Sequence, residues 1–191
     1  MNPPAPAIRG FTGAYHFLSN FDMTPFVYRG ATCASGEHAF QADKFFKTDP
    51  AQYQVVLDAL SPSKAKYHGR NQSIPIQPGW DDGVAYSVMA DVVAAKFGQN
   101  PRLRDALLAT GRAWLEEETT WHDNVWGNCV CGNADGRHPG CLEPGKNYLG
   151  LILMALRGAF SQARQEEELV EKHRRARGAP PRGPGERHWW D

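Results

Sequence analysis

The sequence lacks both a net charge and a long apolar run. It holds 21 Lys and Arg against 21 Asp and Glu, which argues against a protein that coats polyanions, because neutralising phosphates requires a basic excess. No stretch approaches the roughly 18–20 apolar residues that a membrane span needs. Residues 1–10 also lack the basic start and apolar core of a signal peptide. We therefore expect a cytoplasmic protein without membrane contact.

Cysteine is scarce, and the common nucleotide-binding glycine patterns are missing. Four Cys in 191 residues do not make a disulfide-rich secreted scaffold. The sequence contains no Gly-x-Gly-x-x-Gly, P-loop or Gly-x-Ser-x-Gly motif. Dinucleotide reduction, NTP hydrolysis and serine-hydrolase chemistry therefore have no support, and we expect no cofactor.

The composition of the sequence, and its helix caps and turn residues, are typical of one globular domain. Hydrophobic residues make up 41% and charged residues 22%, a typical globular balance. Caps, prolines and apolar periodicity predict the elements. These are a hairpin over 25–34, helices from Ser35 through Lys47, from Asp49 to Leu60 and from Ser61 to Gly69, a helix over about 82–98, a helix from Asn100, a strand over 114–118, a long loop over 127–146 and a central helix from Asn147.

These elements predict a mainly helical α+β domain with a small antiparallel sheet near the N-terminus. We expect residues 1–10 to form a flexible arm and residues 11–163 to form the domain. Residues 164–177 form a polar helix extension and residues 178–191 a flexible tail, because the tail is too rich in Pro and Gly to fold alone.

One helix face carries the sharpest candidate chemistry. On a helix through Ser35–Phe45, Glu37, Gln41 and Lys44 fall at i, i+4 and i+7 and therefore on one face. Their long side chains can converge on one ligand. The alternative is an ordinary solvated polar face.

Three further clusters are candidates for ligand contacts. Phe17–Phe21 (FLSNF) places Asn20 between aromatic rings that can stack on a ligand, or it is simply a turn. Trp121–Asn128 (WHDNVWGN) places Asp123 between two Trp, where it either acts in a site or caps a turn. Gly145–Gly150 (GKNYLG) opens the central helix, and such an N-terminus suits a phosphate.

The loop over 127–146 has the residue types of a zinc site. Cys129, Cys131, His138 and Cys141 are of the right kinds, although Cys-x-Cys is tighter than the usual spacing. Cys33 and His122 are further candidates for the same cluster. We interpret these residues as reduced loop thiols and expect no bound metal.

Taken in order, these motifs resemble the NADAR family, also called the YbiA-like domain. The similarity covers about residues 14–158. It is carried by FLSNF, by E-H-x-F-Q-A-x-K-F, by SPSKAK with Gly-Arg, by a Trp ahead of Val-Met, by AKFGQNPRLRDALLATG, by D-N-V-W-G and by G-K-N-Y-L-G-L-I-L-M-A-L-R. The cysteine-containing loop, the basic helix extension and the tail lie outside the shared pattern, and DDGVAYS after Trp80 departs from it.

The resemblance implies an enzyme that splits N-glycosidic bonds. By that analogy Lys44 attacks the anomeric carbon and forms a transient Schiff base, while Glu37 and Asp123 handle protons. The residues expected to line the ligand site are Phe17, Ser19, Asn20, Phe21, His38, Trp80, Trp126, Gly127, Asn147 and Gly150. A Schiff-base lysine must be neutral to attack, so its pKa has to be lowered by burial or by a nearby cation.

Members of the family act on different substrates. The C-terminal segment is the first feature that bears on which substrate this protein cleaves. From Lys172 to Arg187 there are six Lys or Arg against one acid, and such a segment can hold nucleic acid, or it is a plain disordered tail. We favour ADP-ribose on a guanine base of nucleic acid as the substrate. The alternatives are a ribosylated pyrimidine intermediate of riboflavin biosynthesis and a non-catalytic ADP-ribose reader.

Overall fold

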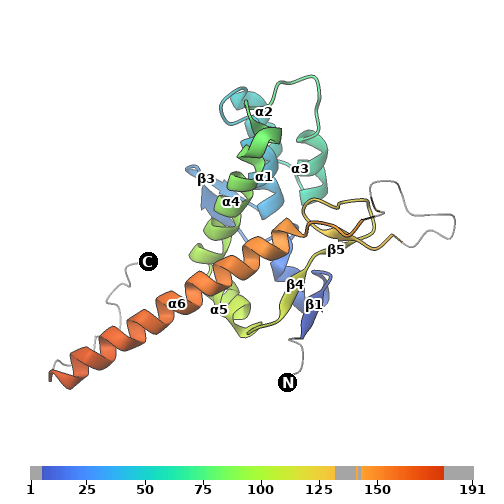
Figure 1. Cartoon of the computed structure of the whole chain (residues 1–191). Coiled ribbons are helices and arrows are strands. Elements are labelled where there is room, and N and C mark those ends of the chain that lie inside the picture. Colours follow the sequence, from blue (N-terminus) through green and yellow to red (C-terminus); the bar gives the residue numbers. More distant parts are fainter. Residues whose placement is uncertain (1–5, 132–140, 142, 179–191) are drawn as a thin grey trace.

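The computed structural model describes residues 6–131, 141 and 143–178, and its arrangement is shown in Figure 1. The α-helices are α1 (Gly36–Asp43), α2 (Pro50–Leu57), α3 (Pro62–His68), α4 (Ala85–Gln99), α5 (Pro101–Ala109) and α6 (Tyr148–Ala176). A 3-10 helix η1 (Gly13–Leu18) and a π-helical turn η2 (Trp80–Val84) accompany them. The strands are β1 (Ala7–Arg9), β2 (Phe26–Tyr28), β3 (Ala31–Cys33), β4 (Trp114–Glu116), β5 (Glu118–Thr119) and β6 (Asn128–Cys129).

The strands form three separate pairs. The predicted hairpin is confirmed as the antiparallel pair β2–β3, and its turn places Arg29 and Gly30 at φ values of 49° and 78°. The other two pairs, β1–β4 and β5–β6, are parallel, so the sheet content is not purely antiparallel as expected. Residues 7–9, which the sequence assigns to a flexible arm, are strand β1, because Ile8 is buried beside β4.

Side-chain caps start the short helices as predicted. Helices α1, α2 and α3 are capped by the side chains of Ser35, Asp49 and Ser61. Each cap accepts one hydrogen bond from the backbone N–H of the residue three positions further along the chain. Helix α1 ends at Asp43 rather than Lys47, because the chain tightens there: the N–H of Phe45 bonds to the carbonyl of Ala42. This tightening places the fully buried Phe45 against Val56 of α2.

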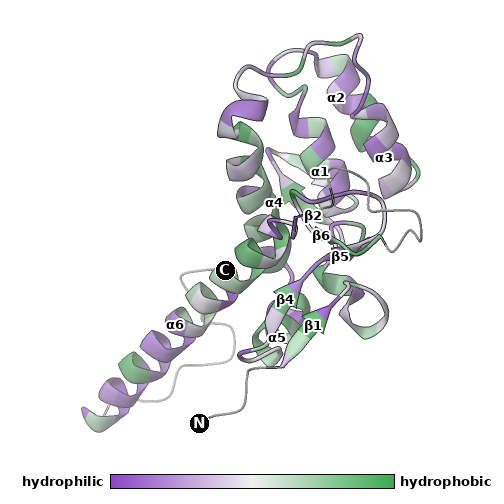
Figure 2. Cartoon of the chain, turned by 45° about the vertical axis from the view of Figure 1, so that its right-hand side comes forward, coloured by the Kyte–Doolittle hydropathy of each residue, from purple (hydrophilic) through white to green (hydrophobic). Residues whose placement is uncertain are grey.

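The main core lies between α4, the first turns of α6 and strand β4. Helix α6 packs against β4, α5 and α4, and Leu149 and Leu153 are buried there. Beyond this contact α6 projects away from the body, and its far half is mostly hydrophilic (Figure 2). In the described part of the chain, no helix is both long and apolar enough to cross a bilayer.

The start of α6 is held against β4 without any room for a side chain at Gly150. An added Cβ at this position would overlap the carbonyl oxygen of Leu115 and the side chain of Asn147. That side chain already donates to the Leu115 carbonyl (2.8 Å) and accepts from the N–H of Glu117 (3.1 Å). The close approach therefore fixes the position of the strand end that carries Glu117.

We predict that Gly150→Ala lowers the free energy of unfolding by about 1–3 kcal/mol, because the added methyl group meets backbone that cannot move aside. Gly158 lies in the same helix with open space around its Cα. Gly158→Ala should therefore raise the stability by up to about 1 kcal/mol. Urea denaturation of both variants measures this, and equal effects would contradict the close approach of α6 to β4.

Candidate active site

Helix α1 is buried along its whole length, including its polar residues. The side-chain amide of Gln41 donates to the Glu37 carboxylate at 2.9 Å. Glu37, Gln41 and Lys44 all line one cavity of about 470 Å³. The face expected from the i, i+4, i+7 spacing is therefore present, and it lines a half-open cavity rather than a fully solvated surface.

Lys44 sits at the end of α1, on the wall of this cavity. Its Nζ donates to the carbonyl of Gly69 at 3.1 Å and lies 5.8 Å from the ring centre of Trp80. Burial lowers the pKa of Lys44, and the positive charge of Arg70 adds to this, although the Glu37 carboxylate opposes it. The amine is therefore shifted toward the neutral form that a nucleophile needs.

The pKa values of two carboxyl groups in the cavity are raised, whereas that of Lys44 is lowered. Burial raises the pKa of Glu37, although Lys66, Gln41 and Lys44 favour its charged form. Burial also raises the pKa of Glu117 to about 8, helped by the nearby negative charges of Asp123 and Glu37. Both groups are thus shifted toward the protonated form, as a general acid requires.

Asp123 has both of the roles that its sequence context allows: it lines the site and it caps a turn. It lines the cavity, and its Oδ1 accepts hydrogen bonds from the N–H groups of Val125 (3.1 Å) and Trp126 (2.9 Å). Asp123 therefore caps the turn that brings Trp126 to the cavity and also presents a negative charge there.

Aromatic rings form a wall of the cavity next to α1. The ring of Phe40 lies 5.2 Å from that of Trp80 and 5.3 Å from that of Trp126. Tyr86 contacts Trp126 at 5.4 Å. With Phe21 on the lining as well, this wall offers flat surfaces on which a nucleobase can stack.

A buried lysine positions the Phe17–Phe21 segment. Lys96 of α4 is 1% exposed, and its Nζ donates to the carbonyls of Phe17 and Ser19, each at 2.9 Å. Phe17 packs in the core against Phe97, and Ser19 lies outside the main cavity, on an adjoining hollow. Asn20, next in the chain, reaches the cavity lining together with Phe21.

Four other residues expected to bind ligand lie outside the cavity lining, and their contacts give them structural roles. His38 is fully buried between the Ser35 hydroxyl (2.7 Å) and the Ala59 carbonyl (2.9 Å). Gly127 is pressed against the backbone of Glu117. Asn147 and Gly150 hold β4 against α6, so the start of this helix is covered by protein rather than open to a phosphate.

The cavity also contains residues that sequence reasoning missed. Lys66, Arg70, Asp81, Tyr86 and Glu117 line it. Lys66 and Arg70 belong to the family motif SPSKAK with Gly-Arg, so that motif was the available signal. Glu117 sits in a run of three glutamates, and nothing in such a run indicates which member points inward.

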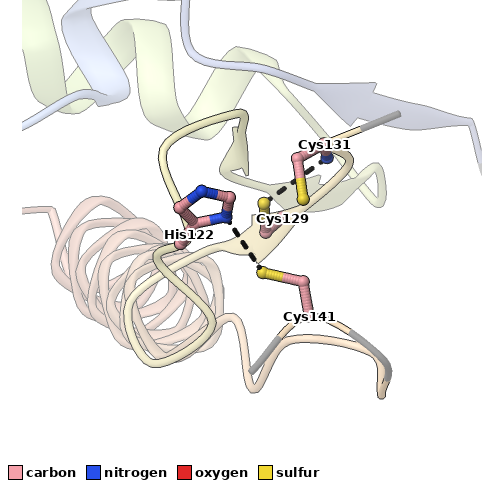
Figure 3. Close-up of side chains that lie close together, drawn as sticks. All are labelled: His122, Cys129, Cys131 and Cys141. Atoms are coloured by element: carbon pink, nitrogen blue, oxygen red, sulfur yellow. Dashed lines mark hydrogen bonds between the residues drawn. The ribbon is translucent and has the colours of Figure 1, made fainter. Parts of the chain in front are cut away.

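The structure brings three cysteines and one histidine together beside the cavity (Figure 3). They are His122, Cys129, Cys131 and Cys141, and their possible ligand atoms all lie within 4.8 Å of one another. His138, which the sequence offered as the fourth member, lies outside the described residues. Cys33 is buried in the main core with Phe26 and Phe40 and is not part of this group.

Comparison with known proteins agrees with the motifs. The NADAR domain family matches residues 10–161. The chain is 38% identical over 143 residues to the N-glycosidase YbiA of Escherichia coli, covering 75% of this chain and 80% of that protein. It is 31% identical over 144 residues to an N-glycosidase of Nostoc punctiforme, covering 75% and 84%. A riboflavin biosynthesis protein of Vibrio vulnificus is 34% identical over 141 residues, with 74% of this chain and 34% of that protein covered.

The fold agrees as well. The NMR structure of E. coli YbiA superposes with a TM-score of 0.69 at 34% identity, covering 84% of this chain and 88% of that chain. This likeness confirms the α+β fold expected from the sequence. The chain therefore belongs to the NADAR domain family and, like its N-glycosidase relatives, is an enzyme of the N-glycosyl hydrolase type.

Proposed function

We propose that this enzyme hydrolyses the N-glycosidic bond between ADP-ribose and a guanine base in nucleic acid, through a Schiff base on Lys44. One observation carries the proposal: a half-buried amine with a lowered pKa shares a cavity with two carboxyl groups of raised pKa. An amine nucleophile needs the first property and a proton donor to the leaving base needs the second.

The proposed reaction starts with attack by the neutral Lys44 amine on C1′ of the ribose. The bond from Nζ to C1′ forms as the bond from C1′ to guanine breaks, and the leaving base takes a proton from Glu37 or Glu117. The ribose ring then opens between C1′ and O4′, with a proton passing from Nζ to O4′, which leaves an imine on Lys44. Water hydrolyses this protonated imine, which releases ADP-ribose, restores the neutral amine and returns one proton to the carboxylate that protonated the base.

Asp123 has a different part in this scheme. Its carboxylate is already held by two backbone N–H groups, so we assign it to stabilising positive charge on the sugar rather than to donating a proton. Gln41 contributes as a positioning residue, because its amide fixes the Glu37 carboxylate at 2.9 Å.

The cavity lining supports a substrate with a diphosphate. Lys66 and Arg70 place two positive charges on the lining, and both also line an adjoining hollow of about 470 Å³ formed with Phe11, Thr12 and His16. A ligand that occupies the cavity can therefore extend past these cations toward the second hollow. This extension favours ADP-ribose over a smaller ribosylated pyrimidine.

The riboflavin-pathway substrate is the second candidate. It is favoured by the similarity to the riboflavin biosynthesis protein of Vibrio vulnificus, although the matching part is about a third of that protein. The third candidate, a reader that binds ADP-ribose without cleaving it, makes no use of the paired pKa shifts of Lys44 and Glu37.

We predict that the purified enzyme releases ADP-ribose from guanine-ADP-ribosylated DNA and leaves the riboflavin-pathway intermediate intact. Lys44→Ala should lower the cleavage rate by about a thousandfold or more, because it removes the nucleophile. Lys47→Ala, which changes an exposed amine three residues further on, should retain the activity. Liquid chromatography of the released products measures the cleavage activity of the wild type and of both variants.

Each alternative outcome identifies a different error. Cleavage of the riboflavin-pathway intermediate alone would contradict the substrate while leaving the chemistry intact. Binding of ADP-ribose with no turnover of either compound would leave a reader. An active, folded Lys44→Ala variant would contradict the Schiff base.

We predict that Glu117 makes the stability depend on pH between about 5 and 8. Its pKa rises from 4.5 to about 8 on folding, so across this range the unfolded chain has lost a proton that the folded protein keeps. The contribution to stability is therefore full below 4.5 and is lost as the pH rises through 8. Its slope approaches about 1.4 kcal/mol per pH unit at most.

Urea denaturation at several pH values measures this slope. Glu117→Gln should flatten the profile, whereas Glu166→Gln, on the exposed part of α6, should leave it as in the wild type. A Glu117→Gln profile that parallels the wild type would show that this carboxyl titrates normally.

We further propose that the basic segment 172–187 contacts nucleic acid. Its described part lies at the far end of α6, which projects from the body (Figure 1). Twenty-nine helical residues span about 43 Å at ~1.5 Å each, so this end is far from the cavity. Glu171 pairs with Arg174 and Arg175, and Lys172 and Arg177 add further positive charge.

This distance makes the expected effect depend on substrate length. Replacing Lys172, Arg174, Arg175 and Arg177 with Gln in the full chain should weaken activity on long ADP-ribosylated oligonucleotides and flatten its salt dependence, because fewer counterions are released. Activity on an ADP-ribosylated mononucleotide should not change. Equal salt slopes for wild type and variant on the long substrate would contradict a role for this segment.

A further inference from the structure

The cluster of His122, Cys129, Cys131 and Cys141 has the geometry of an ion site. Its four possible ligand atoms lie within 4.8 Å of one another, and Figure 3 shows the ring and the three sulfurs directed toward a common space. The Sγ of Cys141 lies 3.5 Å from Nδ1 of His122. Cysteine and histidine are the ligands that zinc prefers in structural sites.

The spacing agrees with tetrahedral coordination. Zinc–sulfur bonds of about 2.3 Å and zinc–nitrogen bonds of about 2.0–2.1 Å put sulfur and nitrogen about 3.6 Å apart and two sulfurs about 3.8 Å apart on a tetrahedron. The sulfur–nitrogen distance of 3.5 Å already matches this value. The remaining atoms need to move by about an ångström or less from an upper limit of 4.8 Å.

The surroundings of the sulfurs also suit a metal. The three cysteines are 1–6% exposed and form no disulfide, and His122 lies on the solvent side. The N–H of Cys131 donates to the sulfur of Cys129 at 3.4 Å, an orienting contact of the kind that supports metal-bound ligands.

We propose that His122, Cys129, Cys131 and Cys141 bind one zinc ion in a closed Cys₃His site. Binding releases the three thiol protons, and zinc with three thiolates and one neutral imidazole carries a single negative charge. Four protein ligands leave no open position for water, so this ion is structural and takes no part in bond cleavage. The sequence favoured free thiols without a metal, and it offered His138 first and His122 as a further candidate.

The four residues of the cluster come from segments on both sides of the turn that carries Asp123 and Trp126. His122 directly precedes Asp123, whereas Cys129 lies in β6 and Cys141 six residues before Asn147. An ion here ties the turn that carries Asp123 and Trp126 to β6 and to the segment that leads into α6. This proposal concerns the position of that turn and does not depend on which N-glycoside is cleaved.

Zinc analysis of the full chain, expressed with zinc and purified without chelator, tests the proposal. We expect about one zinc per chain in the wild type and in Cys33→Ala, which removes a core cysteine outside the cluster. His122→Ala, at the surface, should lose most of the zinc, and Cys141→Ser should lose it too. Replacing zinc with cobalt should give the intense visible absorption of a tetrahedral thiolate site, and a chelator should lower the melting temperature of the wild type but not of His122→Ala.

Three results would overturn the proposal. The first is zinc in the wild type no higher than in His122→Ala. The second is a cobalt spectrum without tetrahedral bands. The third is a disulfide within the cluster, seen as a mass two daltons below the reduced chain. The cobalt titration uses the wild type alone, so a Cys141→Ser variant that fails to fold does not weaken the test.

Discussion

Every residue of α1 is buried, and this burial dictates the chemistry of the site. A polar side chain on a buried helix must find a partner or change its protonation state, because an isolated charge is costly away from water. Glu37 does both: it accepts from Gln41 and its pKa is raised. The pKa of Lys44, at the end of the same helix, is lowered by burial. One packing constraint thus yields an amine shifted toward its neutral form and an acid shifted toward its protonated form beside the same cavity.

The opposite wall of the cavity depends on contacts between distant segments. Asn147 fixes the backbone at Leu115 and Glu117, and the β5–β6 pair closes the loop that carries Asp123. The cysteine and histidine cluster lies at the base of this loop. Residues that looked like ligand contacts in the sequence, such as Asn147 and Gly150, therefore act by holding this wall in place. They thereby position Glu117 and Asp123, to which we assign parts in the proposed reaction.

The features that sequence reasoning predicted are local ones. The Glu37–Gln41–Lys44 face, the caps at Ser35 and Asp49 and the β2–β3 hairpin each depend on residues a few positions apart. The parallel pairs β1–β4 and β5–β6 join segments without a short connecting turn, so no local pattern marks them.

The residues that sequence reasoning missed depend on such long-range contacts. Glu117 is one of three consecutive glutamates, and only the packing of β4 against α6 and the hydrogen bond from its N–H to Asn147 place it on the cavity. The sequence named His122 only as a further candidate for the cysteine cluster, because its place beside the three cysteines depends on the β5–β6 pairing. Lys66 and Arg70 reach the cavity because α3 packs against α1.

The most direct test of the account is chemical trapping of the covalent intermediate during turnover. Borohydride reduces an imine to a stable amine, and peptide mass analysis then locates the attached sugar. The account predicts a ring-opened ADP-ribose on Lys44, formed together with the unmodified nucleic acid and missing in Lys44→Ala. Sustained cleavage with no adduct under these conditions, or an adduct on Lys66 instead, would contradict it.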